Sequence, residues 1–223
     1  MIDLSKIPAD EMARQLGSPQ SDIGIAVAQY MNRLNRNLTE AAYQLLKTDQ
    51  GNHVLEIGFG NGHLIPLLLK TTEDIYYSGI DASPTMVAEA IKANQSLIDA
   101  GRADIRLASV ESLPFANSTF DRAIGINTMY FWPDPVKGLK DLLRVLKPSG
   151  CLVLACISPE TAALTPTMKT EFGVNVFDKE KIISLHKTAG FTKIDIINYD
   201  EMGQLSNGKP LPRRCYLSRA ELC

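Results

Sequence analysis

The chain has 223 residues, a formal net charge of −2 and a hydrophobic content of 45%. This is an ordinary globular composition, sufficient for one large domain or two small ones, and the charge gives no electrostatic reason to expect nucleic acid as a partner. No apolar run reaches the ~18 residues of a membrane span, and the N-terminus lacks the apolar core of a signal peptide. We therefore expect a cytoplasmic protein that engages neither membrane nor nucleic acid.

The first 48 residues carry two helical patterns and are expected to form an N-terminal helical lid or extension. Apolar residues recur at helical spacing over 22–34. A second helix is predicted to start at Asn37, with Glu40 as its capping-box partner. Residues 49–223 then form the main domain, as a single globular unit.

Within the main domain, strand patterns alternate with helix patterns. Ser83, Asp134 and Asp178 stand where the N-caps of three helices are predicted. This alternation predicts a three-layer, Rossmann-like α/β fold with a mostly parallel sheet. No helical pattern separates the last two strands, which predicts a hairpin and thus seven strands with one antiparallel near the edge. The expected strands are 52–58, 75–81, 104–109, 120–127, 151–157, 191–199 and 214–220.

The most specific motif is a glycine turn between the first strand and its helix. Gly58, Gly60 and Gly62 follow an apolar run, and Asp81 ends the next strand nineteen residues later. Glycine allows a tight turn and the close approach of a ligand to the backbone. A carboxylate at the tip of the second strand can accept hydrogen bonds from both hydroxyls of a ribose. The layout is that of a nucleotide-binding βαβ unit.

The cysteines show no metal or disulfide pattern. None of them forms a CxxC pair, and two lie in a predicted core strand. We interpret them as buried or incidental thiols, with no metal site. They are Cys151, Cys156, Cys215 and Cys223.

Five short motifs follow one another in order over about 50–200. They are Glu56-x-Gly58-x-Gly60-x-Gly62, Gly79-Ile80-Asp81-Ala82-Ser83, Leu113-Pro114-Phe115 with Phe120-Asp121, Leu146-Lys147-Pro148-Ser149-Gly150, and Ala189-Gly190-Phe191. Together they resemble the motifs of the class I S-adenosylmethionine-dependent methyltransferases, and most closely a small-molecule branch that includes quinone-biosynthesis enzymes. The resemblance implies transfer of a methyl group from S-adenosylmethionine to a small-molecule acceptor by in-line displacement.

The resemblance also implies roles for individual residues. The glycine turn passes under the methionine half of the cofactor, and Glu56 holds that loop and the cofactor's amino group. Asp81 holds the ribose hydroxyls, and Asn127 reaches the methionine part or the substrate. The predicted cofactor-binding set is Glu56, Gly58, Gly60, Gly62, Asp81, Ala82, Ser83, Ser109, Val110, Glu111 and Asn127.

The adenine contact is left open at this stage. Many relatives place an acid at the end of the third strand, whereas this chain has Ser109 there. Three alternatives remain: the Ser109 hydroxyl, the Glu111 carboxylate or the Val110 backbone.

The acceptor side carries no obvious general base. Tyr30, His63 and Tyr130 are the candidates. The aromatic run 128–132 is either a packing cluster or a wall of the substrate pocket, and Tyr30 with Met31 either closes the pocket or simply packs on the sheet. Within 159–177, Met168 and Phe172 are further candidates to face the acceptor.

Two other functions share parts of this pattern. One is a non-catalytic protein that senses S-adenosylmethionine. The other is a NAD(P)-dependent oxidoreductase, although its usual GxGxxG motif places the third glycine one residue later than here. We expect a monomer or a homodimer.

Overall fold

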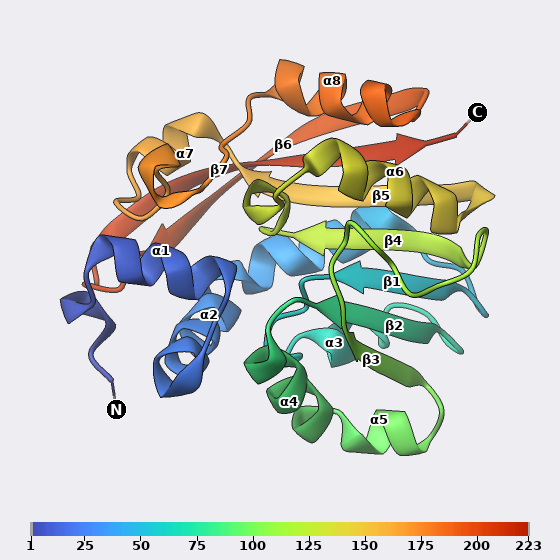
Figure 1. The fold of residues 1–223 in the computed structure, drawn as a ribbon, viewed down its shortest axis with the longest axis horizontal. Coiled ribbons are helices and arrows are strands. Elements are labelled where there is room, and N and C mark those ends of the chain that lie inside the picture. The colour runs from blue at the N-terminus through green and yellow to red at the C-terminus, as the bar shows by residue number, and fades with distance from the viewer. Residues whose placement is uncertain (1, 223) are drawn as a thin grey trace.

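The computed structural model describes residues 2–222 and contains a single seven-stranded sheet with helices on both faces (Figure 1). The strand order is β3-β2-β1-β4-β5-β7-β6. β7 runs antiparallel to both of its neighbours, β5 and β6, and the other four pairings are parallel, so the predicted mostly parallel α/β sheet with one antiparallel strand near the edge is confirmed. The strands are β1 His53–Ile57, β2 Tyr76–Asp81, β3 Ala103–Leu107, β4 Phe120–Ile126, β5 Leu146–Ile157, β6 Lys193–Gln204 and β7 Pro210–Glu221.

The helices fill the connections and the N-terminal segment. Their bounds are α1 Ala9–Gly17, α2 Ser21–Leu46, α3 Ile65–Leu68, α4 Pro84–Ala93, α5 Gln95–Asp99, α6 Pro135–Val145, α7 Pro159–Ala163 and α8 Lys179–Ala189, with short 3-10 turns η1 Leu4–Lys6, η2 Met129–Phe131 and η3 Thr170–Phe172.

Three helices begin at the predicted N-caps. The Ser83 hydroxyl accepts a hydrogen bond from a backbone N–H of α4, and the Asp134 and Asp178 carboxylates do the same for α6 and α8. Proline at the first position of α4 and α6 fits these starts, because proline has no N–H to leave unpaired there. The helix starts that place the loops around the sheet's carboxyl edge are therefore encoded locally.

The N-terminal region differs from the prediction in one respect. No second helix starts at Asn37, because α2 runs unbroken for 26 residues. Glu40 pairs with Arg36 one turn earlier, at 3.1 Å, rather than reaching back to a cap. A capping-box signature in the middle of a helix is thus satisfied by an i,i+4 ion pair.

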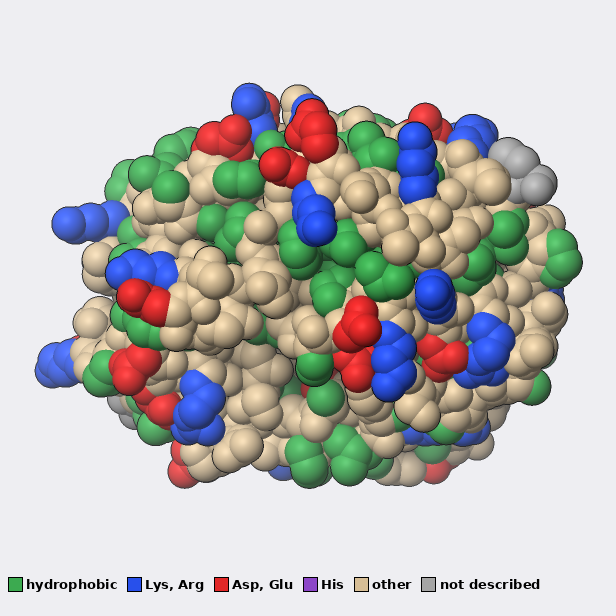
Figure 2. Space-filling model, turned by 45° about the horizontal axis from the view of Figure 1, so that its top comes forward, with side chains coloured by type: hydrophobic (Ala, Val, Ile, Leu, Met, Phe, Trp, Pro, Cys, Tyr) green, Lys and Arg blue, Asp and Glu red, His purple; other side chains and the backbone are tan. Residues whose placement is uncertain are grey.

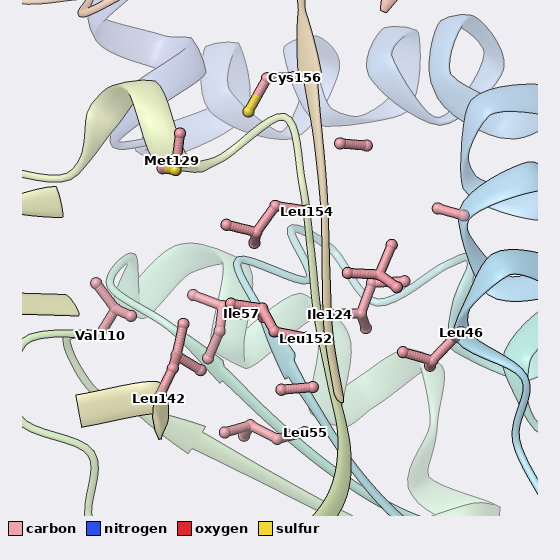
Figure 3. Packing of buried hydrophobic residues seen from close by; sticks show 14 of the residues in the cluster. Leu46, Leu55, Ile57, Val110, Ile124, Met129, Leu142, Leu152, Leu154 and Cys156 are labelled. Carbon is pink, nitrogen blue, oxygen red and sulfur yellow. The ribbon is translucent and has the colours of Figure 1, made fainter. Parts of the chain in front are cut away.

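The hydrophobic core lies on both faces of the sheet. In Figure 3, Leu46 of α2 reaches the sheet from one side, and Leu142 of α6 and Val110 from the other. Leu46 and Leu142 are both fully buried and belong to one continuous core cluster. The second half of α2 is therefore part of the main core.

The last two strands form the predicted antiparallel hairpin, but each is longer than expected. Their pairing extends from Lys193 opposite Glu221 to Gln204 opposite Pro210. The register places Glu201 opposite Arg213. This hairpin carries the turn 205–209 to the edge of the cavity described below.

No helix within residues 2–222 has the length and apolar character required to cross a bilayer. In the same range, Cys151, Cys156 and Cys215 are buried free thiols, whereas Cys223 lies outside the described residues. No grouping of His, Cys, Asp and Glu suited to a metal ion occurs in this described part.

Candidate functional site

The glycine turn connects β1 to α3 at the carboxyl edge of the sheet. All three of its glycines have positive φ, between +60° and +72°. A Cβ at Gly62 would come within 2.7 Å of the Ala90 Cβ, so this position allows α4 to pack closely. A Cβ at Gly60 would meet no protein atom within 4 Å. Space has thus been kept open above Gly60, as a ligand lying across the backbone requires.

A cavity of about 360 Å³ opens from this turn. It lies between the carboxyl edge of the sheet and a cover formed by α1, the first half of α2, residues 165–168 and the β6–β7 turn. In Figure 1, the arrowheads of β1 and β4 point toward the side where α1 lies. Ligands of open parallel sheets bind at this edge. The predicted residues that line the cavity are Tyr30, Glu56, Gly58, Gly60, Asn127 and Tyr130.

Asp81 ends β2 beside the turn without lining the cavity. One carboxylate oxygen accepts from the Gly60 N–H at 3.0 Å, and the other from the Ser83 N–H at 2.9 Å. Burial raises the pKa of Asp81 to about 6, although these backbone N–H groups oppose the shift. The Ala82 N–H is a third backbone donor to this carboxylate. A carboxylate has about four acceptor positions, so capacity to accept a hydroxyl remains.

The N-terminal segment closes the site beside Asp81. The Ser83 hydroxyl donates to the carbonyl of Pro19, in the link between α1 and α2, at 2.5 Å. Ala82 is exposed, and Pro19 itself lines the cavity. The nucleoside end of the predicted cofactor site therefore lies next to the segment that joins the first two helices.

Glu56 is the most strongly perturbed carboxyl group at the cavity. Its side chain is buried on β1 and accepts hydrogen bonds from the hydroxyls of Tyr77, at 2.9 Å, and Tyr43, at 3.3 Å. Burial raises the pKa of Glu56 to about 7, while the two tyrosine donors act against the shift and the nearby Asp81 charge adds to it. No local sequence pattern predicts these tyrosine partners, because they depend on how α2 and β2 pack over β1.

Asn127 is held at the end of β4 in the left-handed region, with φ of +54°. Its side-chain N–H donates to the side-chain Oδ1 of Asn35 at 3.0 Å, and its own side-chain oxygen is buried without a partner among the described residues. Asn35 also accepts from Arg213 at 2.9 Å. The buried Arg213 in turn pairs with Glu201 at 2.9 Å. The hairpin and α2 thus fix the position of Asn127.

The three candidate bases differ in their surroundings. Tyr30 lines the cavity, but its hydroxyl donates to the Gln204 carbonyl at 2.7 Å. His63 is exposed and does not line the cavity. Tyr130 lines the cavity with a buried side chain, and burial raises its pKa well above the usual value.

The aromatic run 128–132 after β4 forms partly a wall of the cavity and partly a packing cluster. Tyr130 and Phe131 line the cavity, whereas Trp132 is buried and donates from its indole N–H to the Thr128 hydroxyl at 3.1 Å. Met168 also lines the cavity, and Phe172 does not.

The predicted adenine-contacting residues sit together outside the cavity lining. Glu111 accepts from the Asp134 N–H at 2.7 Å, at the start of α6. Val110 is buried, with its methyl groups close to Gly138. Ser109 is exposed, and its hydroxyl accepts from the Glu111 N–H at 3.3 Å.

Comparison with known proteins agrees with this geometry. A family model described as a methyltransferase domain matches residues 55–154. The uncharacterized methyltransferase YdaC of Bacillus subtilis is 31% identical over 179 residues, which cover 79% of this chain and 87% of the relative. The chain belongs to the class I S-adenosylmethionine-dependent methyltransferases.

Two further relatives broaden this picture. The methyltransferase is 31% identical to the ubiquinone/menaquinone biosynthesis C-methyltransferase UbiE of Geobacter sulfurreducens, over 56% of this chain and 51% of the relative. Its fold matches the phosphoethanolamine N-methyltransferase 2 of Haemonchus contortus with a TM-score of 0.73 and 13% identity, over 97% of this chain and 60% of the other. That structure contains S-adenosylhomocysteine. The methyltransferase thus spans about half of UbiE.

The residues at the site fit S-adenosylmethionine, the cofactor of this family. The open space above Gly60 can accept a chain lying across the turn. The unpaired oxygen of Asn127 can accept from an ammonium group. Asp81 offers lone pairs to hydroxyls, as a ribose needs.

Proposed function

We propose that this methyltransferase transfers the methyl group of S-adenosylmethionine to a small molecule held in the 360 Å³ cavity. The single observation that carries the proposal is the continuity of the cavity with the glycine turn. Gly58 and Gly60 line the same space as Tyr130 and Met168, so donor and acceptor can meet within one enclosure.

The site geometry supports the following cofactor-binding roles, which are part of the proposal. The turn from Gly58 to Gly62 supports the methionine half, and Asp81 receives the ribose hydroxyls. Glu56 and Asn127 face the amino-acid end, where a carboxylate and an unpaired amide oxygen suit an ammonium group. Ala82 and Ser83 flank the adenine, whose amino group is met by Ser109, Val110 or Glu111.

The cofactor, when bound, supplies an electrophilic methyl group on a positively charged sulfur. The chain's own part is to hold the acceptor in line with that methyl group, and such positioning is worth about 7–11 kcal/mol. Proton removal is not assigned to Tyr30, because its hydroxyl is engaged with Gln204, or to His63, because it is exposed outside the cavity. Residues of α1 and α2 cover one side of the cavity, which reduces the access of water to the reacting groups.

A small acceptor also agrees with the molecular surface. Figure 2 shows acidic and basic side chains interspersed on the face it presents, without an extended basic patch. Nucleic acid binding uses such a patch. We propose a cytoplasmic protein, without membrane or nucleic acid partners, that acts as a monomer or homodimer.

The test is calorimetry with S-adenosylmethionine, S-adenosylhomocysteine and NAD. We expect both sulfur compounds to bind and NAD not to bind; binding of NAD alone would overturn the proposal.

Asp81→Asn should weaken the binding of S-adenosylhomocysteine at least tenfold, since it removes charge-assisted hydrogen bonds to the ribose. Asp104→Asn is the control, because Asp104 lies on β3 away from the cavity. The sensor alternative is tested by supplying a broad panel of acceptors. If the protein binds the cofactor but releases no S-adenosylhomocysteine with any of them, it is a sensor and not an enzyme.

A further inference from the structure

We propose that the acceptor is an uncharged, largely apolar molecule with one oxygen function, and that the Tyr130 hydroxyl binds this oxygen. The inference deepens the proposed function and depends on it, because it assigns the acceptor to the part of the cavity beyond the glycine turn.

The walls of this part are largely apolar, with uncharged polar residues such as Thr165, Thr167 and Asn207 between the apolar ones. They come from α1, α2, the segment after α7 and the β6–β7 hairpin, which surround the space on several sides. Burying an apolar acceptor against such walls gains about 25 cal/mol for each Å² removed from water. Representative wall residues are Met12, Leu16, Met31, Phe131, Met168 and Leu211.

The charges at the cavity are already compensated. Among its lining residues within 2–222, only Glu56 and Arg213 are charged. The Arg213 guanidinium is buried, pairs with Glu201 and donates to Asn35 and to the Leu34 carbonyl. Glu56 accepts hydrogen bonds from two tyrosine hydroxyls and, in the proposed function, faces the cofactor's ammonium group rather than the acceptor. A charged acceptor would therefore lose its hydration without gaining a free counter-ion, which is costly.

Tyr130 stands out among the tyrosines around the cavity because its hydroxyl has no partner. The Tyr30 hydroxyl donates to Gln204, and those of Tyr43 and Tyr77 donate to Glu56. The Tyr130 side chain is only 4% exposed, yet no described residue forms a hydrogen bond with its hydroxyl. The hydroxyl is not among the fully buried, unpartnered polar atoms of the described residues, and Tyr130 lines the cavity, so the hydroxyl is accessible to a ligand there. A ligand oxygen in the cavity is its natural partner.

The surroundings of Tyr130 make it a donor. The thiols of Cys156 and Cys215 lie near the phenol, and desolvation raises its pKa well above the usual value, although Arg213 acts in the opposite direction. The phenol stays neutral at physiological pH and can donate its proton in a hydrogen bond. Its ring is fixed against Phe131, with the ring centroids 4.8 Å apart, so the donor is held in place. A phenol, alcohol or carbonyl oxygen fits this donor.

The test uses three probes that share an ethylbenzene core: 4-ethylphenol with a hydroxyl, ethylbenzene without a polar group, and 4-ethylbenzoate with a carboxylate. Their affinities for the S-adenosylhomocysteine complex are measured by ligand-observed NMR titration. We expect 4-ethylphenol to bind about 3- to 10-fold more tightly than ethylbenzene, as one hydrogen bond provides, and 4-ethylbenzoate to bind most weakly. Tyr130→Phe should make 4-ethylphenol and ethylbenzene equivalent without changing S-adenosylhomocysteine affinity. Tyr199→Phe, on β6 outside the cavity lining, should leave the preference intact.

Each other result has a distinct meaning. A preference for 4-ethylphenol that survives Tyr130→Phe, equal affinities in the unmodified protein, or tight binding of 4-ethylbenzoate would overturn the inference. Failure of all three probes to bind while S-adenosylhomocysteine binds would overturn the inference and leave the cofactor site standing. Failure of S-adenosylhomocysteine itself to bind would remove the proposed function, and the inference with it.

Discussion

The Tyr77 hydroxyl donates a 2.9 Å hydrogen bond to the Glu56 carboxylate in the interior of the sheet. Tyr77→Phe removes this donor and leaves a buried carboxylate poorly satisfied. We expect the free energy of unfolding to fall by about 1–3 kcal/mol, measured by urea denaturation at pH 8. The neighbouring Tyr76 is 52% exposed, so Tyr76→Phe should change the free energy of unfolding by less than about 0.5 kcal/mol. Equal losses in the two variants would contradict a special role for the hydrogen bond.

The pH dependence of stability should reflect Glu56. Burial raises its pKa from 4.5 to about 7 in the folded protein, so the folded state binds the proton more tightly than the unfolded chain. The resulting stabilisation is fully present below pH 4.5 and is lost as the pH rises through about 7, with a range on the order of 3 kcal/mol.

Glu56→Gln should therefore flatten the fall in unfolding free energy between pH 5 and pH 8, as measured by urea denaturation. Part of the fall should remain, because burial also raises the pKa of Asp81, from 3.8 to about 6. Glu171, which is exposed, provides the control variant Glu171→Gln. An unchanged pH profile in Glu56→Gln would show that Glu56 titrates normally.

Gly60 and Gly101 form a matched pair of positions. Both have positive φ, and at both an added Cβ would meet no protein atom within 4 Å. Alanine at either site should cost about 1–2 kcal/mol of stability for the left-handed backbone. Only Gly60→Ala should also lower the affinity for S-adenosylhomocysteine, by tenfold or more, because only the Cβ at position 60 enters the cavity. Calorimetry on the two variants gives the comparison, and similar affinities would argue against the glycine turn as the cofactor cradle.

Arg213 and Glu201 form a buried pair between the hairpin strands. Glu201→Gln leaves the guanidinium without its counter-charge and should destabilise the protein by about 3–5 kcal/mol. The double variant Arg213→Met with Glu201→Gln should recover part of this loss, which a double-mutant cycle in urea measures. Additive losses would indicate that the two charges do not interact.

Much of the fold follows from local sequence signals. Asp134 and Asp178 cap helices as predicted, and the missing crossover helix after residue 200 correctly indicated the hairpin. Those features depend on residues close together in the chain. The continuity of α2 was missed because Asn37 and Glu40 match a capping box, and only packing along the whole helix decides against a break there.

The polar network of the site could not have been predicted in the same way. Asn127 meets Asn35 across 92 residues, and Arg213 meets Asn35 across 178. These contacts depend on the hairpin register and on the path of α2, for which no local pattern exists. The glycines and Asp81 were recognisable because one βαβ unit contains all of them.

The unbroken course of α2 has a mechanical consequence. Its 26 residues form a rod about 39 Å long. Its C-terminal end is anchored in the core by Leu46 and Tyr43, and its first half carries Tyr30 and Met31 at the cavity. A helix that is fixed in the core at one end cannot rotate away from the cavity as a rigid body. We therefore expect ligands to enter by displacement of the short segment before residue 21, where the Pro19 carbonyl accepts a hydrogen bond from Ser83.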